Sequence, residues 1–360
     1  MTCTRIVELK DRSYSIHIGT NLFPRIAAWI NEAGLPGKLL LVSDDRVYPL
    51  YGERLVSGLT TAGFEVAHVV VPSGESSKCH AQLIQLYDAA LEAGLERSSG
   101  ILALGGGVVG DLAGFAAATY LRGIPCVQIP TTLLAMVDSA VGGKTGINLP
   151  QGKNLIGAFH QPALVVADTS TLRSLPQREF CAGLAEVVKY GVIADPELLD
   201  VLEARSPREL QADDDILETL VRRSCEIKAD VVCRDEREGG LRAILNFGHT
   251  VGHAIEQVTG YGLYLHGEAI AVGMVYAARL SEKQMGFSSS NTARLIRILR
   301  HLDLPVDQPD VSWSDLMTAM QRDKKKKKGA VGFVLARQLG QVEFGCPMPV
   351  DLLASVWDDS

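Results

Sequence analysis

Three histidines and one glutamate have the residue types and the spacing of a metal site. His249 and His253 are four positions apart in a segment with helical periodicity, so one helical face would present both rings to a single ion. His266 follows closely, and Glu186 lies in a segment that is apolar on nearly every side. A buried carboxylate needs a partner or a metal, and one glutamate with two histidines and an open position is typical of catalytic zinc.

The same residues leave two questions open. Glu186 precedes Lys189 by three positions on one helical face, so a structural ion pair is the alternative to a metal ligand. Spacing by itself favours His249 with His253 as a helical ligand pair, but His266 offers a third ring within 18 positions. The pattern therefore predicts a divalent metal centre without deciding which two histidines bind the ion.

A glycine-rich segment in the first half has the spacing of a phosphate-binding turn. Gly105, Gly107 and Gly110 follow the apolar run 101–104 and open a helix, which satisfies the pattern G-x-G-x-x-G. Glycines let the backbone approach a pyrophosphate, and the first helical turn supplies N–H donors. Packing of a tight strand-to-helix turn is the alternative reason for these glycines. The segment predicts a dinucleotide site. In the usual dinucleotide fold an acidic residue about 20 positions later binds the ribose, and none lies there in this chain, so the fold is not the usual one.

Other polar groups follow predicted strands at the places where an open sheet binds its ligands. Asp44 comes directly after an apolar run, where it would bind a ribose hydroxyl or cap the following helix. The segment 73–78 and the pair Thr131-Thr132 also come directly after apolar runs. These positions extend the predicted dinucleotide site along the edge of a sheet.

Basic side chains gather in glycine-rich or apolar segments of an otherwise acidic chain. The net charge of -7 argues against a dedicated nucleic-acid binder, because binding a phosphate backbone needs an electropositive surface. Cations in such segments favour a small anionic substrate with phosphate and carboxylate groups. The lysine run 324–328 is interpreted as a loop that contributes one or two lysines to phosphate. The charged and polar residues concerned are Arg122, Asp138, Lys144, Lys153, Asn154, Lys189, Lys228 and Arg242.

The elements that would position these groups follow two patterns along the chain. Up to about 176, apolar runs alternate with helical stretches, which predicts a parallel sheet covered on both faces after an opening hairpin. The runs are 38–43, 64–71, 100–104, 124–130 and 163–167, and the helical stretches are 46–62, 80–93 and 108–120. Helical periodicity then covers 178–193, 196–203, 214–230, 247–259, 267–285 and 292–301. We predict an α/β dinucleotide-binding domain over 1–176 and a mostly α-helical metal- and substrate-binding domain over 177–360.

The composition suits an enzyme with large apolar cores and reduced thiols. Of the 360 residues, 47% are hydrophobic and 21% are charged, and the seven scattered cysteines form no C-x-x-C pair. This usage predicts free thiols in the cytoplasm. The segment 100–121 is long and apolar enough to span a bilayer, but its glycines and Asp111 predict a strand, a turn and a helix instead. We expect no membrane segment and see no targeting signal over 1–10.

Several long motifs occur together and in order along the chain. They cover 73–75, 105–111, 135–148, 152–161, 183–191, 246–254, 266–269 and 323–325. Through these motifs the chain resembles the 3-dehydroquinate synthase family of the sugar phosphate cyclases over essentially its whole length. The resemblance implies a dehydroquinate-synthase-like fold, with NAD bound by the first domain. It also implies one divalent ion per active site, zinc or cobalt, bound by the second.

The resemblance implies a carbon–oxygen lyase of the shikimate pathway, in aromatic amino acid and chorismate biosynthesis. Its substrate would be 3-deoxy-D-arabino-heptulosonate 7-phosphate, a phosphorylated and carboxylated sugar acid, and its products 3-dehydroquinate and phosphate. NAD would oxidise the substrate transiently, phosphate would leave by elimination, the hydride would return, and ring opening with an intramolecular aldol closure would follow. The family also implies a cytoplasmic homodimer without a nucleic acid or membrane partner.

The resemblance assigns individual residues to these roles. The metal falls on Glu186, His249 and His266, which moves His253 to the substrate. The positions implied for NAD are Asp44, Ser73, Gly74, Glu75, Ser76, Ser77, Lys78, Gly107, Val108, Val109, Gly110, Asp111, Thr131, Thr132, Asp138, Lys144, Lys153, Thr171, Leu172, Arg173 and Ser174. The positions implied for substrate and catalysis are Arg122, Asp138, Lys144, Asn154, Lys189, Lys228, Arg242, Asn246, His253, Lys324 and Lys325. Because the lysine run has five members, the lysine that meets the phosphate stays open.

Three other functions are the alternatives. A related sugar phosphate cyclase would act on sedoheptulose 7-phosphate or glucose 6-phosphate, which lack a carboxylate. The joint presence of Arg242, Asn246 and His253 favours the carboxylated substrate. A metal-dependent alcohol or polyol dehydrogenase would share the architecture but accumulate NADH, and the many lysines argue against it. The combination of metal ligands, dinucleotide segment and cations argues against a non-catalytic regulator.

Overall fold

The chain folds into two compact units, and each unit is built from two segments of the chain. The computed structural model describes residues 2–35, 37–260, 262–323 and 331–358. Unit 1 comprises Met1–Leu175 and Asp214–Cys233, and unit 2 comprises Pro176–Asp213 and Arg234–Ser360. Unit 1 is an α/β structure and unit 2 is mostly helical, which confirms the predicted fold class.

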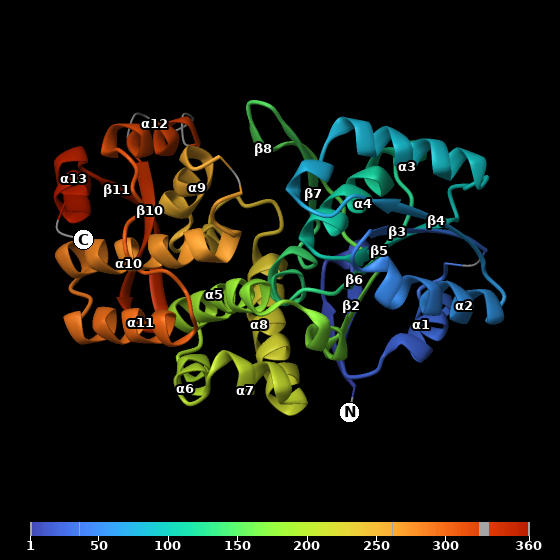
Figure 1. Ribbon diagram of the computed structural model, residues 1–360, viewed down its shortest axis with the longest axis horizontal. Helices are drawn as coiled ribbons and strands as arrows, with labels where there is room; N and C mark the ends of the chain where they lie inside the picture. Colours follow the sequence, from blue (N-terminus) through green and yellow to red (C-terminus); the bar gives the residue numbers. More distant parts are fainter. Residues whose placement is uncertain (1, 36, 261, 324–330, 359–360) are drawn as a thin grey trace. The chain divides into compact units, whose positions relative to one another are not determined.

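A seven-stranded sheet forms the centre of unit 1 (Figure 1). Its strands lie in the order β1-β2-β9-β6-β5-β3-β4. β1 and β2 form an antiparallel hairpin, and the five other strands extend the sheet in parallel from β2. The strands are β1 (Cys3–Val7), β2 (Tyr14–Gly19), β3 (Lys38–Asp44), β4 (Glu65–Val71), β5 (Gly100–Gly105), β6 (Cys126–Pro130) and β9 (Leu164–Asp168).

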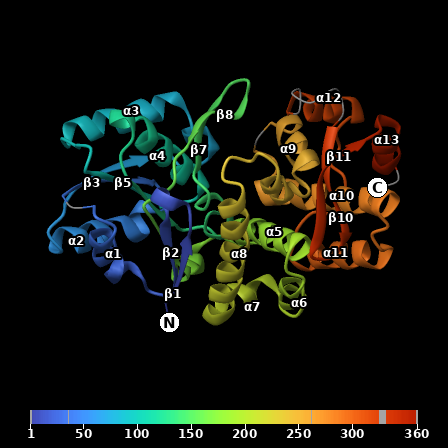
Figure 2. The ribbon, with the colours of Figure 1, turned by 180° about the vertical axis from the view of Figure 1, so that it is seen from behind.

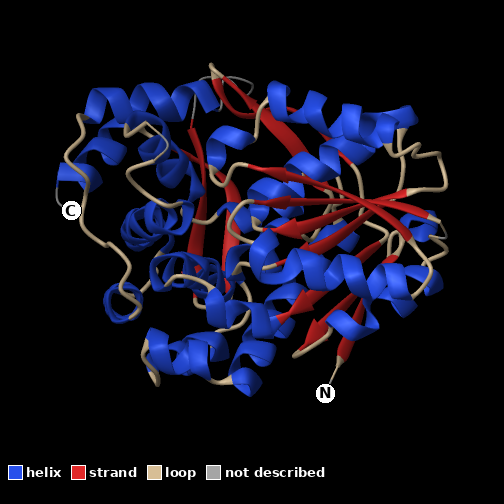
Figure 3. Ribbon diagram, turned by 45° about the vertical axis from the view of Figure 1, so that its right-hand side comes forward, coloured by secondary structure: helices blue, strands red, loops and turns tan. Residues whose placement is uncertain are grey.

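Alternate side chains of the parallel strands pack on opposite faces of this sheet. In β3, Leu40 and Val42 join the core that includes residues of α3 (His80–Glu92) and α4 (Gly107–Thr119). Leu39 and Leu41 join the core on the other face, with residues of α1 (Ile26–Glu32) and α2 (Glu53–Thr61). Figure 3 shows helices on both sides of the strands. Burial on both faces makes such strands continuous apolar runs, which is why the sequence pattern located them.

The parallel strands end along one edge of the sheet, and most of the residues predicted to bind NAD follow these ends. Asp44 is the last residue of β3, and Gly105 is the last residue of β5, directly before α4. The segments 73–78, 131–132 and 171–174 follow β4, β6 and β9 in the same way. The carboxyl edge of a parallel sheet is where open α/β structures bind their ligands.

A second hairpin in unit 1 was not predicted from the sequence. It consists of β7 (Lys144–Leu149) and β8 (Gly152–Phe159), and its register places Gly146 opposite Gly157. A Cβ atom at either glycine would lie under 3.0 Å from the backbone of the facing strand. The close backbone approach requires glycines, and these interrupt the alternation by which a strand is recognised.

The helix α8 (Asp214–Arg234) corrects the predicted division of the chain at 176. The sequence placed it in the second domain, but Asp214–Cys233 belongs to unit 1. Lys228 Nζ donates to the backbone oxygen and to Oδ1 of Asp138 at 2.6 and 2.7 Å, and Cys225 Sγ donates to the Met136 carbonyl oxygen at 3.2 Å. Periodicity identifies an amphipathic helix but does not tell which core its apolar face joins.

Unit 2 combines helices with a hairpin that was also not predicted (Figure 2). β10 (Val331–Gln338) and β11 (Gln341–Met348) form this antiparallel hairpin. Phe333 of β10 is buried in one core with Tyr276 of α10 (His266–Met285) and Trp357 of α13 (Val350–Asp358). None of the helices that the structure describes is long and apolar enough to cross a membrane. The elements are α5 (Gln177–Ile193), α6 (Glu197–Glu203), α7 (Pro207–Ala212), α9 (His249–Val258), α10 (His266–Met285), α11 (Ser289–His301), α12 (Trp313–Asp323), β10 (Val331–Gln338), β11 (Gln341–Met348) and α13 (Val350–Asp358).

Candidate active site

Three side chains of unit 2 come together with the geometry of a metal centre. Glu186 lies within α5, while His249 and His266 are the first residues of α9 and α10. Glu186 Oε1 is 3.6 Å from Nε2 of His249 and 3.6 Å from Nε2 of His266. Two ligand atoms that each lie about 2.1 Å from a tetrahedral ion are roughly 3.4 Å apart. The donor set of one carboxylate oxygen and two imidazole nitrogens therefore fits a divalent ion of the zinc type.

Glycines allow the helices of this site to approach one another. A Cβ atom on Gly267 would lie under 3.0 Å from the carbonyl oxygen of Ala182, so α10 meets α5 at this point with backbone against backbone. A Cβ atom on Gly273 of α10 would collide in the same way with the carbonyl oxygen of Gly248, next to His249. Gly248 itself has a φ of 81°, a left-handed conformation that favours glycine. These contacts bring Glu186, His249 and His266 close enough together to hold one ion.

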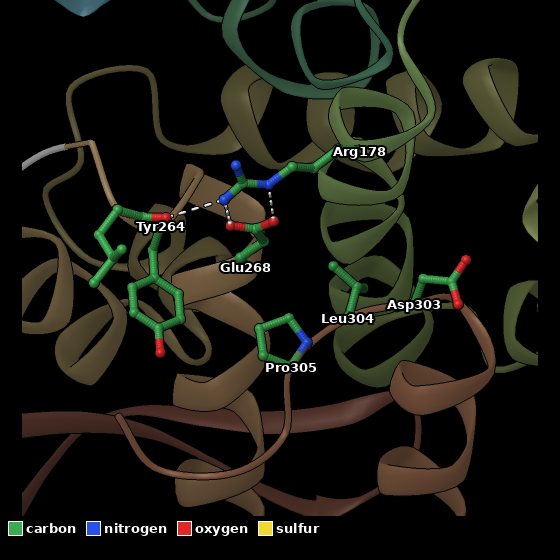
Figure 4. A pocket seen from close by; sticks show the side chains of 7 residues that line it. Arg178, Tyr264, Glu268, Asp303, Leu304 and Pro305 are labelled. Carbon is green, nitrogen blue, oxygen red and sulfur yellow. Dashed lines mark hydrogen bonds and ion pairs between the residues drawn. The ribbon is translucent and has the colours of Figure 1, made fainter. Parts of the chain in front are cut away.

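An ion pair fixes the beginning of α10 to α5 (Figure 4). Arg178 of α5 donates from Nε and Nη2 to the two carboxylate oxygens of Glu268, at 2.6 and 2.8 Å. Glu268 Oε2 also accepts the backbone N–H of Leu265 at 2.8 Å, which caps the helix at the residue before His266. Arg178 and Glu268 line a surface pocket of about 510 Å³. No metal ligand of the set above is among the described residues that line it.

The carboxylate of Glu186 serves two sets of partners. Lys189 Nζ forms an ion pair with Oε2, while Oε1 faces the two histidines. The side chains of Glu186 and Lys189 are 0% and 1% exposed, so this charge pair is fully buried. The sequence left a structural ion pair and a metal ligand as alternatives, and the geometry accommodates both, because each uses a different oxygen.

His253 lies beside this group of three candidate ligands. Its ring centroid is 5.2 Å from that of His249 and 5.9 Å from that of His266. Among the described residues, two groups have ligand atoms within 4.8 Å of one another: Glu186 with His249 and His266, and His253 with Glu256 and His266. Neither group contains the helical pair His249 and His253 that spacing alone favoured.

Burial and charge act differently on the two histidines that face Glu186. Burial lowers the pKa of His249 well below its usual value, although Glu186 acts in the opposite direction. Burial also acts to lower the pKa of His266, but the carboxylates of Glu186 and Glu256 outweigh it and raise the pKa to about 10. A cation, either a proton or a metal ion, is therefore favoured at His266 between these carboxylates.

The turn from β5 into α4 is closely packed at its glycines. Cβ atoms on Gly105 and Gly110 would lie 2.7 Å from Val109 Cγ2 and from Gln128 Oε1, and one on Gly107 would lie 2.9 Å from Ser139 Oγ. Packing is therefore one reason for these glycines, and it is compatible with a phosphate at the same turn. The first turn of α4 nevertheless follows the carboxyl end of β5, the place that suits a pyrophosphate.

The segment 73–78 is joined to the start of α4 and to the hairpin β7–β8. Lys78 forms a buried ion pair with Asp111, and burial raises the pKa of Asp111 although Lys78 acts to lower it. The backbone N–H of Asn148 donates to the Lys78 carbonyl oxygen at 2.8 Å, and its side chain donates to Glu75 Oε1 at 2.7 Å. These bonds order the segment at the carboxyl edge of the sheet.

Comparison with known proteins places these features in one family. The family description "3-dehydroquinate synthase N-terminal" matches residues 68–182, and "3-dehydroquinate synthase C-terminal" matches residues 183–326. The chain is 50% identical over 350 residues to the 3-dehydroquinate synthase of Desulforamulus reducens, covering 97% of this chain and 98% of that relative. The chain belongs to the 3-dehydroquinate synthase family. Its members are enzymes, so the family excludes a purely regulatory protein.

Two solved structures share the fold over nearly the whole chain. The 2-epi-5-epi-valiolone synthase ValA of Streptomyces hygroscopicus subsp. jinggangensis, with NAD+ and Zn2+ bound, superposes with a TM-score of 0.89 at 29% identity. The match covers 99% of this chain and 98% of that one. A 2-deoxy-scyllo-inosose synthase complexed with carbaglucose-6-phosphate, NAD+ and Co2+ has a TM-score of 0.88 at 27% identity, with 99% and 100% covered.

The remaining candidates of unit 2 lie on the short helix Leu241–Asn246, which leads into α9. Arg242 is buried, and its Nη1 donates to the Glu236 carbonyl oxygen at 2.5 Å. Asn246 Nδ2 donates to Glu238 Oε1 at 2.9 Å. Lys324 and Lys325 lie outside the described residues, so their positions stay predictions.

Several candidates of unit 1 have local structural partners. Asp44 Oδ1 accepts the backbone N–H groups of Arg46 and Val47 at 2.9 Å each, in the turn that precedes the short helix Tyr48–Gly52. The predicted N-cap is therefore a turn bond, because the helix begins later than the sequence indicated. Arg122 has a φ of 69°, in a turn where Leu121 is also left-handed. The backbone N–H of Asn154, whose φ is 55°, donates to Asn148 Oδ1 at 2.9 Å. Left-handed non-glycine residues often cluster at ligand sites.

Exposure separates the other predicted NAD residues into two kinds. The side chains of Ser77, Val109, Thr131, Thr171 and Leu172 are buried, so any contact of Val109 or Leu172 with NAD would come from the backbone. The partly or fully exposed group comprises Ser73, Gly74, Glu75, Ser76, Gly107, Val108, Gly110, Thr132, Asp138, Lys144, Lys153, Arg173 and Ser174.

Sequence reasoning missed Glu256, which contacts His266. Glu256 lies three positions after His253 and seven after His249 on α9, so all three share one helical face. That spacing was visible in the sequence. The contact to His266 was not, because it joins two helices.

Proposed function

We propose that this enzyme converts 3-deoxy-D-arabino-heptulosonate 7-phosphate into 3-dehydroquinate and phosphate. The observation that carries the proposal is the position of Glu186 Oε1, 3.6 Å from Nε2 of both His249 and His266. Its relatives of about 50% identity over nearly the full length have the name of this activity. Basic residues such as Lys189 and Arg242 have the chemistry that binds phosphate and carboxylate groups, which supports the proposal.

The proposed enzyme works with NAD and one divalent ion, Zn2+ or Co2+. The two solved neighbours contain NAD+ together with one of these ions, which supports the assignment. Glu186, His249 and His266 would bind the ion, and the loops at the carboxyl edge of the sheet, with Asp44, Lys78 and the start of α4, would bind NAD. When bound, NAD accepts and returns a hydride, and the ion lowers the pKa of a hydroxyl group that it coordinates.

The residues next to the metal ligands would orient the sugar. Lys189 places a buried positive charge beside Glu186, where it would face the hydroxyl group whose carbon gives up the hydride. His253 is exposed on the face of α9 that also carries His249, and its ring would donate to or accept from a hydroxyl group of the sugar. Arg242 would bind the substrate carboxylate and Asn246 a ring hydroxyl, since both precede α9 on one short helix.

Cations of unit 1 would stabilise the phosphate as it leaves. Lys228 is buried and bonded to Asp138, whereas Lys144 and Arg122 are exposed. Cations that are placed before reaction stabilise the charge that develops on a departing phosphate. Asn154 would add a side-chain donor. Lys324 and Lys325 are proposed to join this group.

The test measures phosphate release by the whole chain. Protein freed of metal by a chelator would be given NAD, the substrate and Zn2+, Co2+ or Mg2+. We expect phosphate and 3-dehydroquinate in equal amounts with Zn2+ or Co2+, without accumulation of NADH. Glu186→Gln should abolish turnover, whereas Glu282→Gln, a matched change on α10, should not. No phosphate release with any ion would refute the function, and net NADH would indicate a polyol dehydrogenase.

A related cyclase activity is the second candidate, because the two solved neighbours are named 2-epi-5-epi-valiolone synthase and 2-deoxy-scyllo-inosose synthase. Sedoheptulose 7-phosphate and glucose 6-phosphate, which have no carboxylate, would be assayed in parallel. Preference for either over the heptulosonate would replace the first proposal. Arg242→Met should lower kcat/KM for the carboxylated substrate alone.

We further propose a cytoplasmic homodimer. All seven cysteines are free, which agrees with a reducing compartment. β8 exposes Leu155, Ile156 and Phe159, and exposed apolar groups of this size often mark a protein interface. Light scattering should give twice the chain mass of 38.7 kDa. A monomer at micromolar concentration would contradict the dimer.

A further inference from the structure

The two histidines that face Glu186 are bonded through their second ring nitrogens. His249 Nδ1 lies 3.2 Å from the carbonyl oxygen of Phe247, and His266 Nδ1 lies 3.2 Å from Oε2 of Glu256. Both rings therefore direct Nε2 toward Glu186 Oε1. We propose that Glu256 is a positioning residue for the metal centre, which accepts the Nδ1–H of His266 and holds its Nε2 toward the ion.

Glu256 is placed for this role by α9. It is 3% exposed, and it lies on the helical face that carries His249 at its beginning. Ionising a carboxylate in such a place is costly unless a donor or a cation meets it. The His266 ring supplies a donor across the contact between α9 and α10, where Gly252 lets the two backbones approach.

The physical consequence concerns both geometry and charge. An imidazole that donates Nδ1–H to a carboxylate is held in one tautomer, with its lone pair on Nε2. The same bond prevents rotation of the ring and makes Nε2 a stronger donor to a metal. The Nδ1 atom of His249 meets a neutral carbonyl oxygen, whereas that of His266 meets the carboxylate of Glu256. The negative charge of Glu256 would therefore act on the ion through His266, in addition to the charge of Glu186.

The inference rests on the proposed metal site, and its test measures metal binding without turnover. The dissociation constant of Zn2+ would be measured by competition with a coloured chelator for the wild type, Glu256→Gln and Glu256→Asp. We expect Glu256→Gln to weaken Zn2+ binding by about 10- to 100-fold while the stoichiometry stays at one ion. The visible absorption of bound Co2+ should change in shape, because its ligand field changes. Glu282→Gln, the matched variant on α10, should leave both readouts as in the wild type.

A double-mutant comparison separates positioning from general damage to the fold. His266→Ala keeps Glu186 and His249, so it should bind Zn2+ too weakly to survive dialysis but still measurably in a titration. In this background Glu256→Gln should not weaken the residual Zn2+ affinity further, because the residue through which Glu256 acts is gone. A further loss in that background would mean that Glu256 acts by another route, and the proposal would fall. Thermal unfolding of each variant identifies those that do not fold. If Glu256→Gln does not fold, the Zn2+ affinity is measured in Glu256→Asp, which keeps the negative charge but shortens the side chain.

Other results would also overturn the inference. Unchanged Zn2+ affinity in Glu256→Gln would show that the contact does not position His266. Two ions per wild-type chain, with one lost in Glu256→Gln, would make Glu256 a ligand of a second ion with His253 and His266. Either result leaves phosphate release by the wild type intact. A wild type that binds no divalent ion would remove the proposed function and the inference together.

Discussion

A methyl group on Gly267 would lie closer than 3.0 Å to the carbonyl oxygen of Ala182, so α5 and α10 have no room for a side chain between them. Gly267 follows His266, and Ala182 is about one helical turn before Glu186. The distance between the carboxylate and the imidazole is therefore set by a backbone contact rather than by the ligands themselves.

Gly267→Ala should push α10 away from α5 and damage the metal site. We expect a loss of about 1–3 kcal/mol in the free energy of unfolding, as for other overpacked sites. Zn2+ affinity should fall with it, because His266 moves from Glu186. Urea denaturation and Zn2+ titration measure both. Gly58→Ala is the control, since a Cβ atom at this helical position in α2 meets nothing within 4 Å. Unchanged Zn2+ affinity in Gly267→Ala would contradict the prediction.

Lys189→Met should destabilise the chain mainly when no divalent ion is present. The substitution leaves the fully buried carboxylate of Glu186 without its ion-pair partner, and breaking a buried pair costs about 3–5 kcal/mol. Saturating Zn2+ should recover part of this loss, because the ion neutralises the same carboxylate. Urea denaturation with and without Zn2+ gives the comparison, with the exposed Lys283→Met of α10 as control. Equal losses under both conditions would argue against Glu186 as a ligand.

Substitution of two neighbouring histidines should separate metal binding from turnover. His266→Ala should lose the ion, because its Nε2 faces Glu186 Oε1 at 3.6 Å. His253→Ala should keep the ion and lower kcat, because His253 lies outside that ligand set. Metal content after dialysis and phosphate release are the two measurements. The opposite pattern would restore the helical pair of His249 and His253 as ligands.

Two buried cysteines should resist thiol reagents in the native protein. Burial raises the pKa of Cys126 and of Cys225 to about 12. A thiol with this pKa is ionised in roughly one molecule in ten thousand at pH 8, and the thiolate is the reactive form. The ionised fraction, and so the labelling rate, should rise as the pH increases. Peptide mapping after labelling at pH 8 should find both unmodified until denaturant is added, and fast native labelling would contradict their burial.

The sequence predicted best those strands and helices that can be recognised from their own residues alone. Strands buried on both faces, such as β3 and β5, are continuous apolar runs, and helices such as α5 and α10 have clear periodicity. The hairpin β7–β8 was missed because Gly146 and Gly157 break its alternation. The place of α8 was missed because its partners, among them Asp138, are distant in sequence. Local patterns predict elements, and pairings between distant segments need the fold.

The candidate site shows the same limit. Residue types pointed to Glu186 and to a cluster of histidines, but helical spacing alone paired His249 with His253. The structure groups His249 with His266 because α9 and α10 both begin at this place, a relation that no periodicity contains. Glu256 shares a helical face with His253, yet its role depends on a ring of the next helix.

The two-segment construction of each unit limits how the chain can be divided. The chain passes from one unit to the other at Leu175, at Asp213 and again at Cys233. A fragment that ends at 176 would lack α8. It would therefore lose the hydrogen bonds from Lys228 to Asp138 and the hydrogen bond from the Cys225 thiol to the Met136 carbonyl oxygen. A fragment that begins at 177 would carry the apolar face of α8 without the core that buries it. No single cut in the polypeptide therefore yields two complete halves, and truncation or fusion at this boundary should give aggregating fragments.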